Sequence, residues 1–205
     1  MPTAAIRPLA EANPGSFPVQ MALGRALRKD GKVDEAMQAF ERAAQLVPLA
    51  GGKDSAHDQM AAMAIEKKDT ARAIAELTAL VAVDFNNVEA ARLLAGLLRE
   101  TKVEDPAKLR PVYERIAAID PFDSDAHVQL GRMALRRNEA ETAAREFRTV
   151  LALGPVDKAA AFTDLAESYF QAGKHAEAKK QTLAALEIAP TYERAQGLLL
   201  KLVER

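Results

Sequence analysis

A nearly regular period is the feature that most constrains how this chain can fold. Short apolar stretches end in a proline or a phenylalanine at six places: Pro14, Pro48, Phe85, Pro121, Pro155 and Pro190. The successive spacings are 34, 37, 36, 34 and 35 residues. A period of this length indicates a supersecondary unit that is stacked on its own copies, because one such unit cannot bury its apolar face alone.

Each period contains two amphipathic helices with apolar residues at fixed unit positions. In the unit that starts at Ser124, Leu130 and Ala134 at positions 7 and 11 lie on one face of the first helix. Gly131 and Ala143, at positions 8 and 20, are small and let the two helices cross closely. We expect position 24 to fill the layer between hairpins. The same offsets recur in the units that start at Phe17, Asp54 and Ala159.

The third unit departs from this register. It fits if it begins at Val88 and if the turn before its second helix holds two extra residues. Tyr113 and Ile116 then become core positions, and Pro111 should bend the helix or delay its start. In the regular units a glycine such as Gly31 falls in the hairpin turn, where a positive φ is convenient.

The unit pattern, L-G…Y…A…F…A…P, resembles the tetratricopeptide repeat. The resemblance covers residues 17–190 as five repeats that start near 17, 54, 88, 124 and 159, and residues 191–205 resemble a first helix used as a C-terminal cap. It implies an all-α fold, a right-handed α-solenoid of antiparallel helix hairpins that forms a tetratricopeptide-like superhelix.

Residues 1–16 form either the remnant of a preceding helix or an irregular N-terminal arm. Pro14 is in phase with Pro48, but the partner helix is missing, so Ile6 and Leu9 should leave an apolar edge uncovered. We therefore expect the chain to be part of a longer protein, and self-association through this N-terminal edge is a further hypothesis.

The residues give no sign of catalysis. The chain lacks cysteine, and it contains neither HExxH nor a Gly-x-Ser-x-Gly or phosphate-binding loop. His57 and His127 share a unit position but lie two units apart, roughly 20 Å from two helix packing distances, so they cannot chelate one ion. His175 precedes a helix and is expected at the surface. We predict no enzyme activity, no cofactor and no metal site.

The resemblance also implies where a ligand binds. In tetratricopeptide proteins the first helices line a concave groove, and its residues come mainly from unit positions 2, 5, 9, 12 and 13. Carried over to this sequence, the protein-binding groove consists of Met21, Arg25, Arg28, Lys29, Asp58, Ile65, Arg92, Arg99, Val128, Arg132, Leu135, Arg136, Glu167 and Phe170. The guanidinium group of arginine can donate two hydrogen bonds to one carboxylate, so the predicted ligand is a protein or peptide segment with acidic and apolar residues. The alternative is that these arginines form a solvated surface paired with neighbouring glutamates.

The leading hypothesis is thus a non-catalytic protein–protein interaction scaffold, a repeat region of a larger bacterial-type protein. The alternative is an accessory C-terminal repeat region of an enzyme, for example a metalloprotease, whose catalytic domain lies outside this chain. Balanced charge, 28 basic and 29 acidic residues, argues against nucleic acid as a partner. No apolar run is long enough for membrane insertion, and no signal peptide is visible. The predicted protein is soluble, and the sequence fits cytoplasm and periplasm equally.

Overall fold

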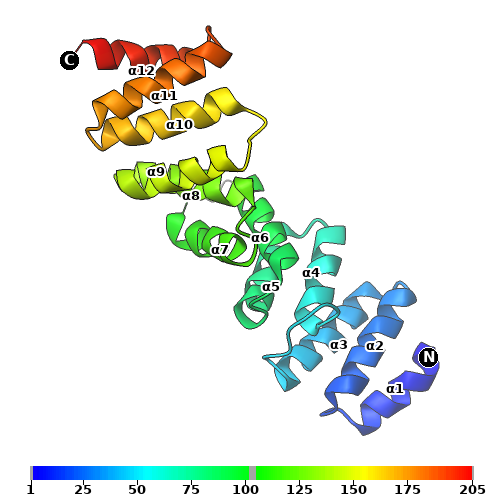
Figure 1. Cartoon of the computed structure of the whole chain (residues 1–205). Helices are drawn as coiled ribbons and strands as arrows, with labels where there is room; N and C mark the ends of the chain where they lie inside the picture. The colour runs from blue at the N-terminus through cyan, green and yellow to red at the C-terminus, as the bar shows by residue number, and fades with distance from the viewer. Residues whose placement is uncertain (1, 102–104, 205) are drawn as a thin grey trace. The chain divides into compact units, whose positions relative to one another are not determined.

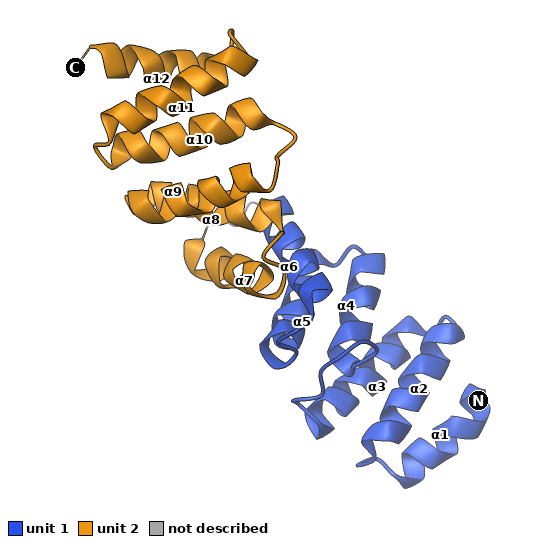
Figure 2. Cartoon of the chain, in the orientation of Figure 1, with its two compact units in different colours: residues 1–103 blue, residues 104–205 orange. Residues whose placement is uncertain are grey.

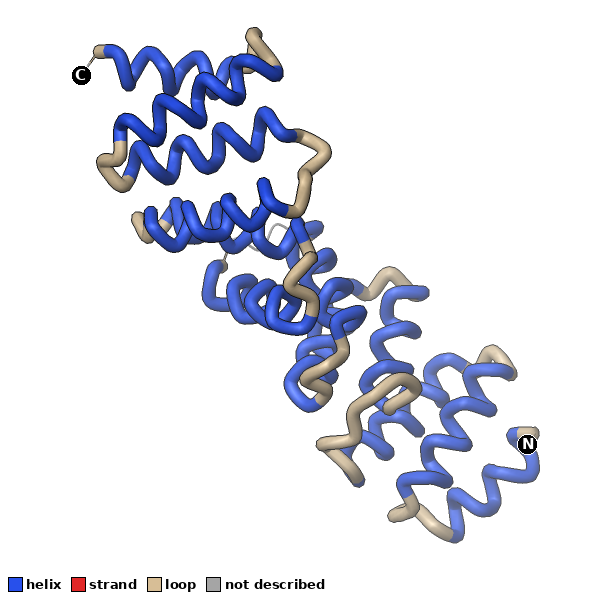
Figure 3. Tube along the Cα trace, viewed as in Figure 1, coloured by secondary structure: helices blue, strands red, loops and turns tan. Residues whose placement is uncertain are grey.

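The computed structural model describes residues 2–101 and 105–204, and every regular element in this part of the chain is an α-helix (Figures 1 and 3). The helices are α1 (Thr3–Ala12), α2 (Phe17–Lys29), α3 (Val33–Leu46), α4 (Ala56–Glu66), α5 (Thr70–Val83), α6 (Val88–Glu100), α7 (Pro106–Ile119), α8 (Ser124–Arg136), α9 (Ala140–Ala152), α10 (Lys158–Gln171), α11 (His175–Ile188) and α12 (Glu193–Val203).

The chain divides into two compact units, Met1–Val103 with α1 to α6 and Glu104–Arg205 with α7 to α12 (Figure 2). Within each unit every helix packs on the next one along the chain. This is the packing order of an α-solenoid, which confirms the predicted all-α fold. The predicted third repeat falls across the division, since α6 closes unit 1 and α7 opens unit 2.

Each unit contains a hairpin built around a glycine and a phenylalanine. A Cβ atom on Gly24 of α2 would lie 2.6 Å from Cε1 of Phe40 on α3, and one on Gly131 of α8 would lie 2.7 Å from Cζ of Phe147 on α9. Both phenylalanines are fully buried. The glycine at unit position 8 therefore creates the space that the ring at position 24 fills. Position 24 thus packs inside its own hairpin, and not only between hairpins as we predicted.

In the other two regular hairpins, alanine replaces the glycine at position 8 and a side chain smaller than phenylalanine occupies position 24. In the hairpin of α4 and α5, position 8 is Ala61 and position 24 is Leu77. In the hairpin of α10 and α11 the corresponding pair is Ala166 and Thr182, and all four residues are almost completely buried. The buried hydroxyl of Thr182 donates to the carbonyl of Ala178 at 2.8 Å, so it needs no partner outside its helix.

The hairpin turns share one residue with a positive φ at unit position 15. Gly31 and Gly173 have φ of 74° and 73°, as expected for glycine. Lys68 and Asn138 hold the same position with φ of 59° and 60°. A side chain at this position is strained, and lysine more so than asparagine, which tolerates the left-handed region better.

The third repeat and the N-terminal segment, which depart from the regular pattern, both form helices in the structure. Helix α7 begins at Pro106, so Pro111 lies inside the helix and does not delay its start. Tyr113 and Ile116 are buried, as predicted. In the N-terminal segment α1 packs on α2, and Ile6 is buried in the core of unit 1, so only Leu9 of the expected apolar edge is exposed.

Candidate binding cleft in unit 2

A cleft of about 600 Å³ opens where the first helices of consecutive hairpins in unit 2 meet. Its lining comes from α8, α10 and α12: Arg132, Leu135, Arg136, Asp164, Glu167, Phe170, Gln171 and Arg194. The volume lies within the ~300–1,000 Å³ that ligand pockets usually enclose.

Helical periodicity explains why these residues meet. Arg132, Leu135 and Arg136 are spaced i, i+3 and i+4 on α8, so they share one face of that helix. On α10, Asp164 and Glu167 are three residues apart, and Phe170 follows after three more, which keeps all three toward the same side. The cleft is therefore lined by one face of α8, one face of α10 and the capping helix α12.

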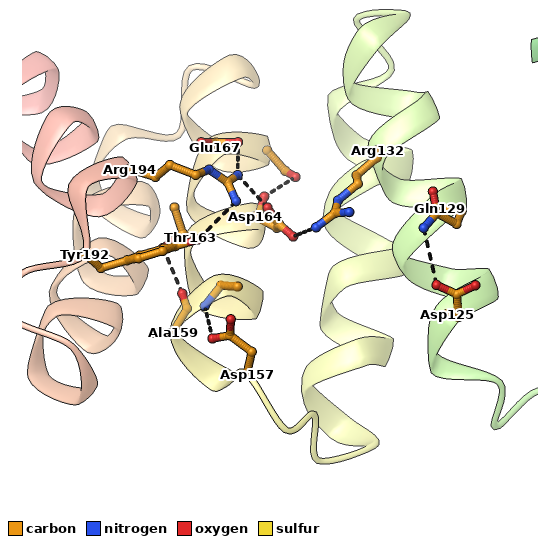
Figure 4. Close-up of polar contacts among 12 residues, drawn as sticks. Asp125, Gln129, Arg132, Asp157, Ala159, Thr163, Asp164, Glu167, Tyr192 and Arg194 are labelled. Carbon is orange, nitrogen blue, oxygen red and sulfur yellow. Dashed lines mark hydrogen bonds and ion pairs between the residues drawn. The ribbon is translucent and has the colours of Figure 1, made fainter. Parts of the chain in front are cut away.

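A buried carboxylate organises the charges of the cleft. The side chain of Asp164 is only 5% exposed, and its Oδ1 accepts a hydrogen bond from Nη2 of Arg194 at 2.6 Å. The same Nη2 lies 2.9 Å from Oε2 of Glu167, and Nη2 of Arg132 lies 3.6 Å from the other oxygen of Asp164 (Figure 4). Asp164 thus holds one arginine from α12 tightly and one from α8 loosely.

The pKa of the Arg194 guanidinium reflects this arrangement. Partial burial acts to lower its pKa, but the hydrogen bonds to Asp164 and Glu167 and the attraction of both carboxylates outweigh burial and raise it above the ordinary value. Arg194 therefore stays charged and serves as the counter-ion of the two α10 carboxylates. Burying Asp164 without this partner would be costly.

The floor of the cleft is apolar. Leu135 is half-buried and packs against the hydrophobic core of unit 2. Phe170 is also half-buried, and its ring meets the ring of His175 edge to face with centroids 5.5 Å apart.

Hydrogen bonds of Gln171 join the two helices that line the cleft. Nε2 of Gln171 donates to the carbonyl of Leu135 at 3.1 Å and to Oδ1 of Asn138 at 2.8 Å, which connects the end of α8 to α10.

The one lining cation with no counter-ion in the described part of the chain is Arg136. It is exposed at the last turn of α8, one helical turn after Arg132. The cleft thus combines an apolar floor, a neutralised ion cluster and an unneutralised guanidinium that can take a bidentate carboxylate.

The structure brings together five of the residues predicted for the groove: Arg132, Leu135, Arg136, Glu167 and Phe170. Val128 is half-buried against the core of the same unit. Sequence reasoning missed Asp164 and Arg194. Arg194 stands at unit position 2 of the capping helix, so extending the position rule to α12 would have found it. Asp164 carries no such signal, because it stands at unit position 6, which belongs neither to the core pattern nor to the groove positions.

The remaining predicted groove residues belong to unit 1. Arg28 is held by Oε1 of Gln59 at 2.8 Å and by Oε1 of Glu66 at 2.5 Å. Met21 is 3% exposed and packs in the core of unit 1. The others are half-buried or exposed: Arg25, Lys29, Asp58, Ile65, Arg92 and Arg99.

The two histidines at the shared unit position pair with glutamates inside their own hairpins. Nδ1 of His57 lies 2.7 Å from Oε2 of Glu76, and Nδ1 of His127 lies 2.8 Å from Oε2 of Glu146. Across residues 2–101 and 105–204, no cluster of three or more candidate ligands could hold a metal ion. None of the helices described is long and apolar enough to cross a membrane.

Comparison with known proteins identifies the repeat. The model of the tetratricopeptide repeat family matches residues 3–50 and 128–193, more than half of the chain. No curated protein sequence matches. The crystal structure of YrrB, a tetratricopeptide repeat protein with an unusual peptide-binding site, is 19% identical and superposes with a TM-score of 0.58 over 94% of this chain and 96% of that one. A structure of MamA AMB-1 is 20% identical, with a TM-score of 0.58 over 85% and 92% of the two chains.

Another MamA structure gives a TM-score of 0.53 at 20% identity, over 83% of this chain and 90% of that one. At these identities the structural similarity establishes the fold alone. The family model and the stacked helix hairpins agree with the repeat predicted from the residues, and the chain belongs to the tetratricopeptide repeat family.

Proposed function

We propose that this chain is a non-catalytic scaffold whose unit 2 cleft binds a protein or peptide segment with acidic and apolar residues. The tetratricopeptide fold supports a protein–protein interaction scaffold in general. The finer proposal rests on one observation: Arg136 has no counter-ion among the residues that the structure describes, and it lies beside an apolar floor of Leu135 and Phe170. An acidic side chain meets the guanidinium while a neighbouring apolar side chain covers the floor.

Among the arginines predicted for the groove, the ion pair of Arg28 with Glu66 and the loose one of Arg132 with Asp164 support the alternative interpretation as an ion-paired surface. Arg194 is fully engaged with Asp164 and Glu167, so it contributes structure rather than an anchor for a ligand. Arg132 is only loosely engaged at 3.6 Å and can share a ligand carboxylate with Arg136. The similar structures named above give no support to an accessory region of a metalloprotease. Self-association through α1 remains a prediction.

A steric block tests whether the cleft binds peptides at all. The chain lacks cysteine, so Gln171→Cys, an exposed lining residue, can be modified uniquely with a bulky maleimide. Peptides are first selected on the unmodified protein from a random displayed library. We expect the modified Gln171→Cys protein to lose them, whereas Arg148→Cys, modified on the exposed face of the second helix α9, keeps them. Equal binding by both modified proteins would overturn the proposed site.

Charge reversal tests the acidic part of the ligand. We expect Arg136→Glu to weaken the selected peptides about tenfold without lowering thermal stability, because the residue is exposed and forms no ion pair within residues 2–101 and 105–204. Arg148→Glu makes the same change in net charge away from the cleft and should leave affinity within about twofold at physiological salt, where distant charges are screened.

A further inference from the structure

A second, smaller hollow adjoins the cleft. It encloses about 320 Å³ between α10 and α12 and is lined by Glu167, Phe170, Glu193, Arg194, Gly197, Leu198 and Lys201. Glu167, Phe170 and Arg194 also line the larger cleft. The two hollows are therefore neighbours, and the Arg194–Glu167 ion pair marks the border between them (Figure 4).

The cations on the two sides of this border stand at related positions. Arg132, Glu167 and Lys201 occupy unit position 9 of the three first helices α8, α10 and α12. The middle member, Glu167, forms an ion pair with Arg194 at 2.9 Å, and Arg194 and Arg132 together balance the charges of Glu167 and Asp164. A ligand that crosses the three helices at this level thus meets the arginines of α8, the ion-paired Glu167 and Phe170 of α10, and a cation on α12.

Of the two acids that line the second hollow, Glu167 pairs with Arg194 and Glu193 lies away from Lys201. Glu193 begins α12 and Lys201 follows eight residues later, which separates them by about 12 Å at ~1.5 Å per residue along the axis. Within the described residues no ion pair involves Lys201. The C-terminal half of α12 therefore offers a second unneutralised cation, as Arg136 does on α8.

We infer that the two hollows form one bipartite groove for an extended segment with two acidic residues about six positions apart and an apolar residue between them. This inference rests on the proposed function of the cleft. Two steps between packed helices of up to about 10 Å each separate α8 from α12 by roughly 20 Å. An extended chain rises ~3.3 Å per residue, so six residues cover that distance. One acidic residue meets Arg132 and Arg136, the apolar one covers Phe170, and the second acidic residue meets Lys201.

The probe is a capped heptapeptide, Glu-Ser-Ser-Leu-Ser-Ser-Glu, titrated into the ¹⁵N-labelled full chain by NMR. Its matched control has the same composition with both glutamates adjacent at one end. We expect the spaced peptide to bind about threefold to fivefold more tightly, the contribution of one exposed ion pair. Lys201→Gln should abolish that difference between the two peptides, whereas Lys180→Gln, exposed on α11, should preserve it.

Gly197 provides an independent steric test. A Cβ atom added there meets nothing within 4 Å, so Gly197→Leu can project into the second hollow without disturbing its neighbours. We expect this variant to weaken the spaced heptapeptide about fivefold without lowering thermal stability. Because the larger cleft stays open, peptides that use it alone should still bind.

The outcomes separate this inference from the proposed function. Equal affinity for the spaced and adjacent heptapeptides, or no effect of Lys201→Gln and Gly197→Leu, overturns the bipartite groove. If library peptides still bind and are lost on modification of Gln171→Cys, the cleft itself survives that result. If the heptapeptide fails to bind while library peptides do, the bipartite groove alone is wrong. If neither binds, both proposals fall.

Discussion

The two units carry different residues at the same unit positions of their first helices, and the contacts between those helices differ as a result. In unit 1, Arg28 at position 12 reaches across to Gln59 and Glu66 and bridges α2 and α4. The matching residues of unit 2 are Leu135 and Gln171, which cannot form an ion pair and instead line an open cleft. At positions 12 and 13 the first helices are thus joined by an ion pair in unit 1, whereas in unit 2 the same positions line an apolar floor and only the looser Arg132–Asp164 contact and Gln171 join α8 to α10. We expect positions 12 and 13 to decide between the two arrangements.

The largest expected effect tests what the units share. Gly131→Ala should lower the free energy of unfolding by about 2–3 kcal/mol, because the new methyl group would lie within 3 Å of the Phe147 ring. Gly24→Ala should cost as much in unit 1. Chemical denaturation gives the loss, and Gly131→Ala combined with Phe147→Leu should recover most of it. A Gly131→Ala protein as stable as the original would contradict the packing described above.

The next effect tests the difference in burial between the two ion clusters. Arg194→Gln should cost about 2 kcal/mol, since it leaves the buried carboxylate of Asp164 with only the loose contact to Arg132. Arg28→Gln in unit 1 should cost about 0.5 kcal/mol, because Glu66 is 63% exposed and water replaces its partner. Thermal unfolding of both variants checks the ratio, and equal losses would show that burial of the acid does not matter.

An exchange of residues between the units tests the comparison directly. Leu135→Arg combined with Gln171→Glu gives unit 2 the residues that bridge unit 1. We expect the new pair to close the cleft and to weaken library-selected peptides about tenfold, or about 1.4 kcal/mol. Gln171→Glu alone is the control, since it adds the acid without the arginine that would reach it. Unchanged affinity in the double variant would mean that positions 12 and 13 do not decide the state of the groove.

The smallest effect concerns the hairpin turns. Lys68→Gly should stabilise unit 1 by about 1 kcal/mol, because it removes a side chain from a backbone with φ of 59°. Asn138→Gly should gain less in unit 2, since asparagine tolerates this region and Oδ1 of Asn138 also accepts a bond from Gln171. Denaturation midpoints of the two variants check the order, and a loss of stability in Lys68→Gly would contradict it.

Sequence reasoning reached the family, and it grouped residues by helix face, for a physical reason. Periodicity fixes which residues share a helix face, so Arg132, Leu135, Arg136, Glu167 and Phe170 could be grouped before any coordinates were known. The period cannot reveal ion pairs that join different repeats. Asp164 stands at a unit position outside both the core and the groove pattern, and its role appears only when Arg194 is seen beside it.

Met21 shows what the period leaves open about burial. The position rule treats every first helix alike, but how far a side chain at position 5 is covered depends on the helices that pack beside it. In unit 1, α1 packs on α2 and Met21 becomes part of the core. Such coverage depends on local packing and is therefore not encoded in the repeat pattern.

The pairing of a glycine with a phenylalanine inside one hairpin also governs how such arrays can be recombined. A chimera joined at the loops after Pro48 or Pro121 inherits both partners from the same parent and keeps their complementary shapes. A chimera joined within the hairpin turn separates them, and it can place an alanine opposite a phenylalanine or a glycine opposite a threonine. Exchange of whole repeats should therefore preserve the packing of the hairpin, whereas exchange of single helices leaves either a clash or a void.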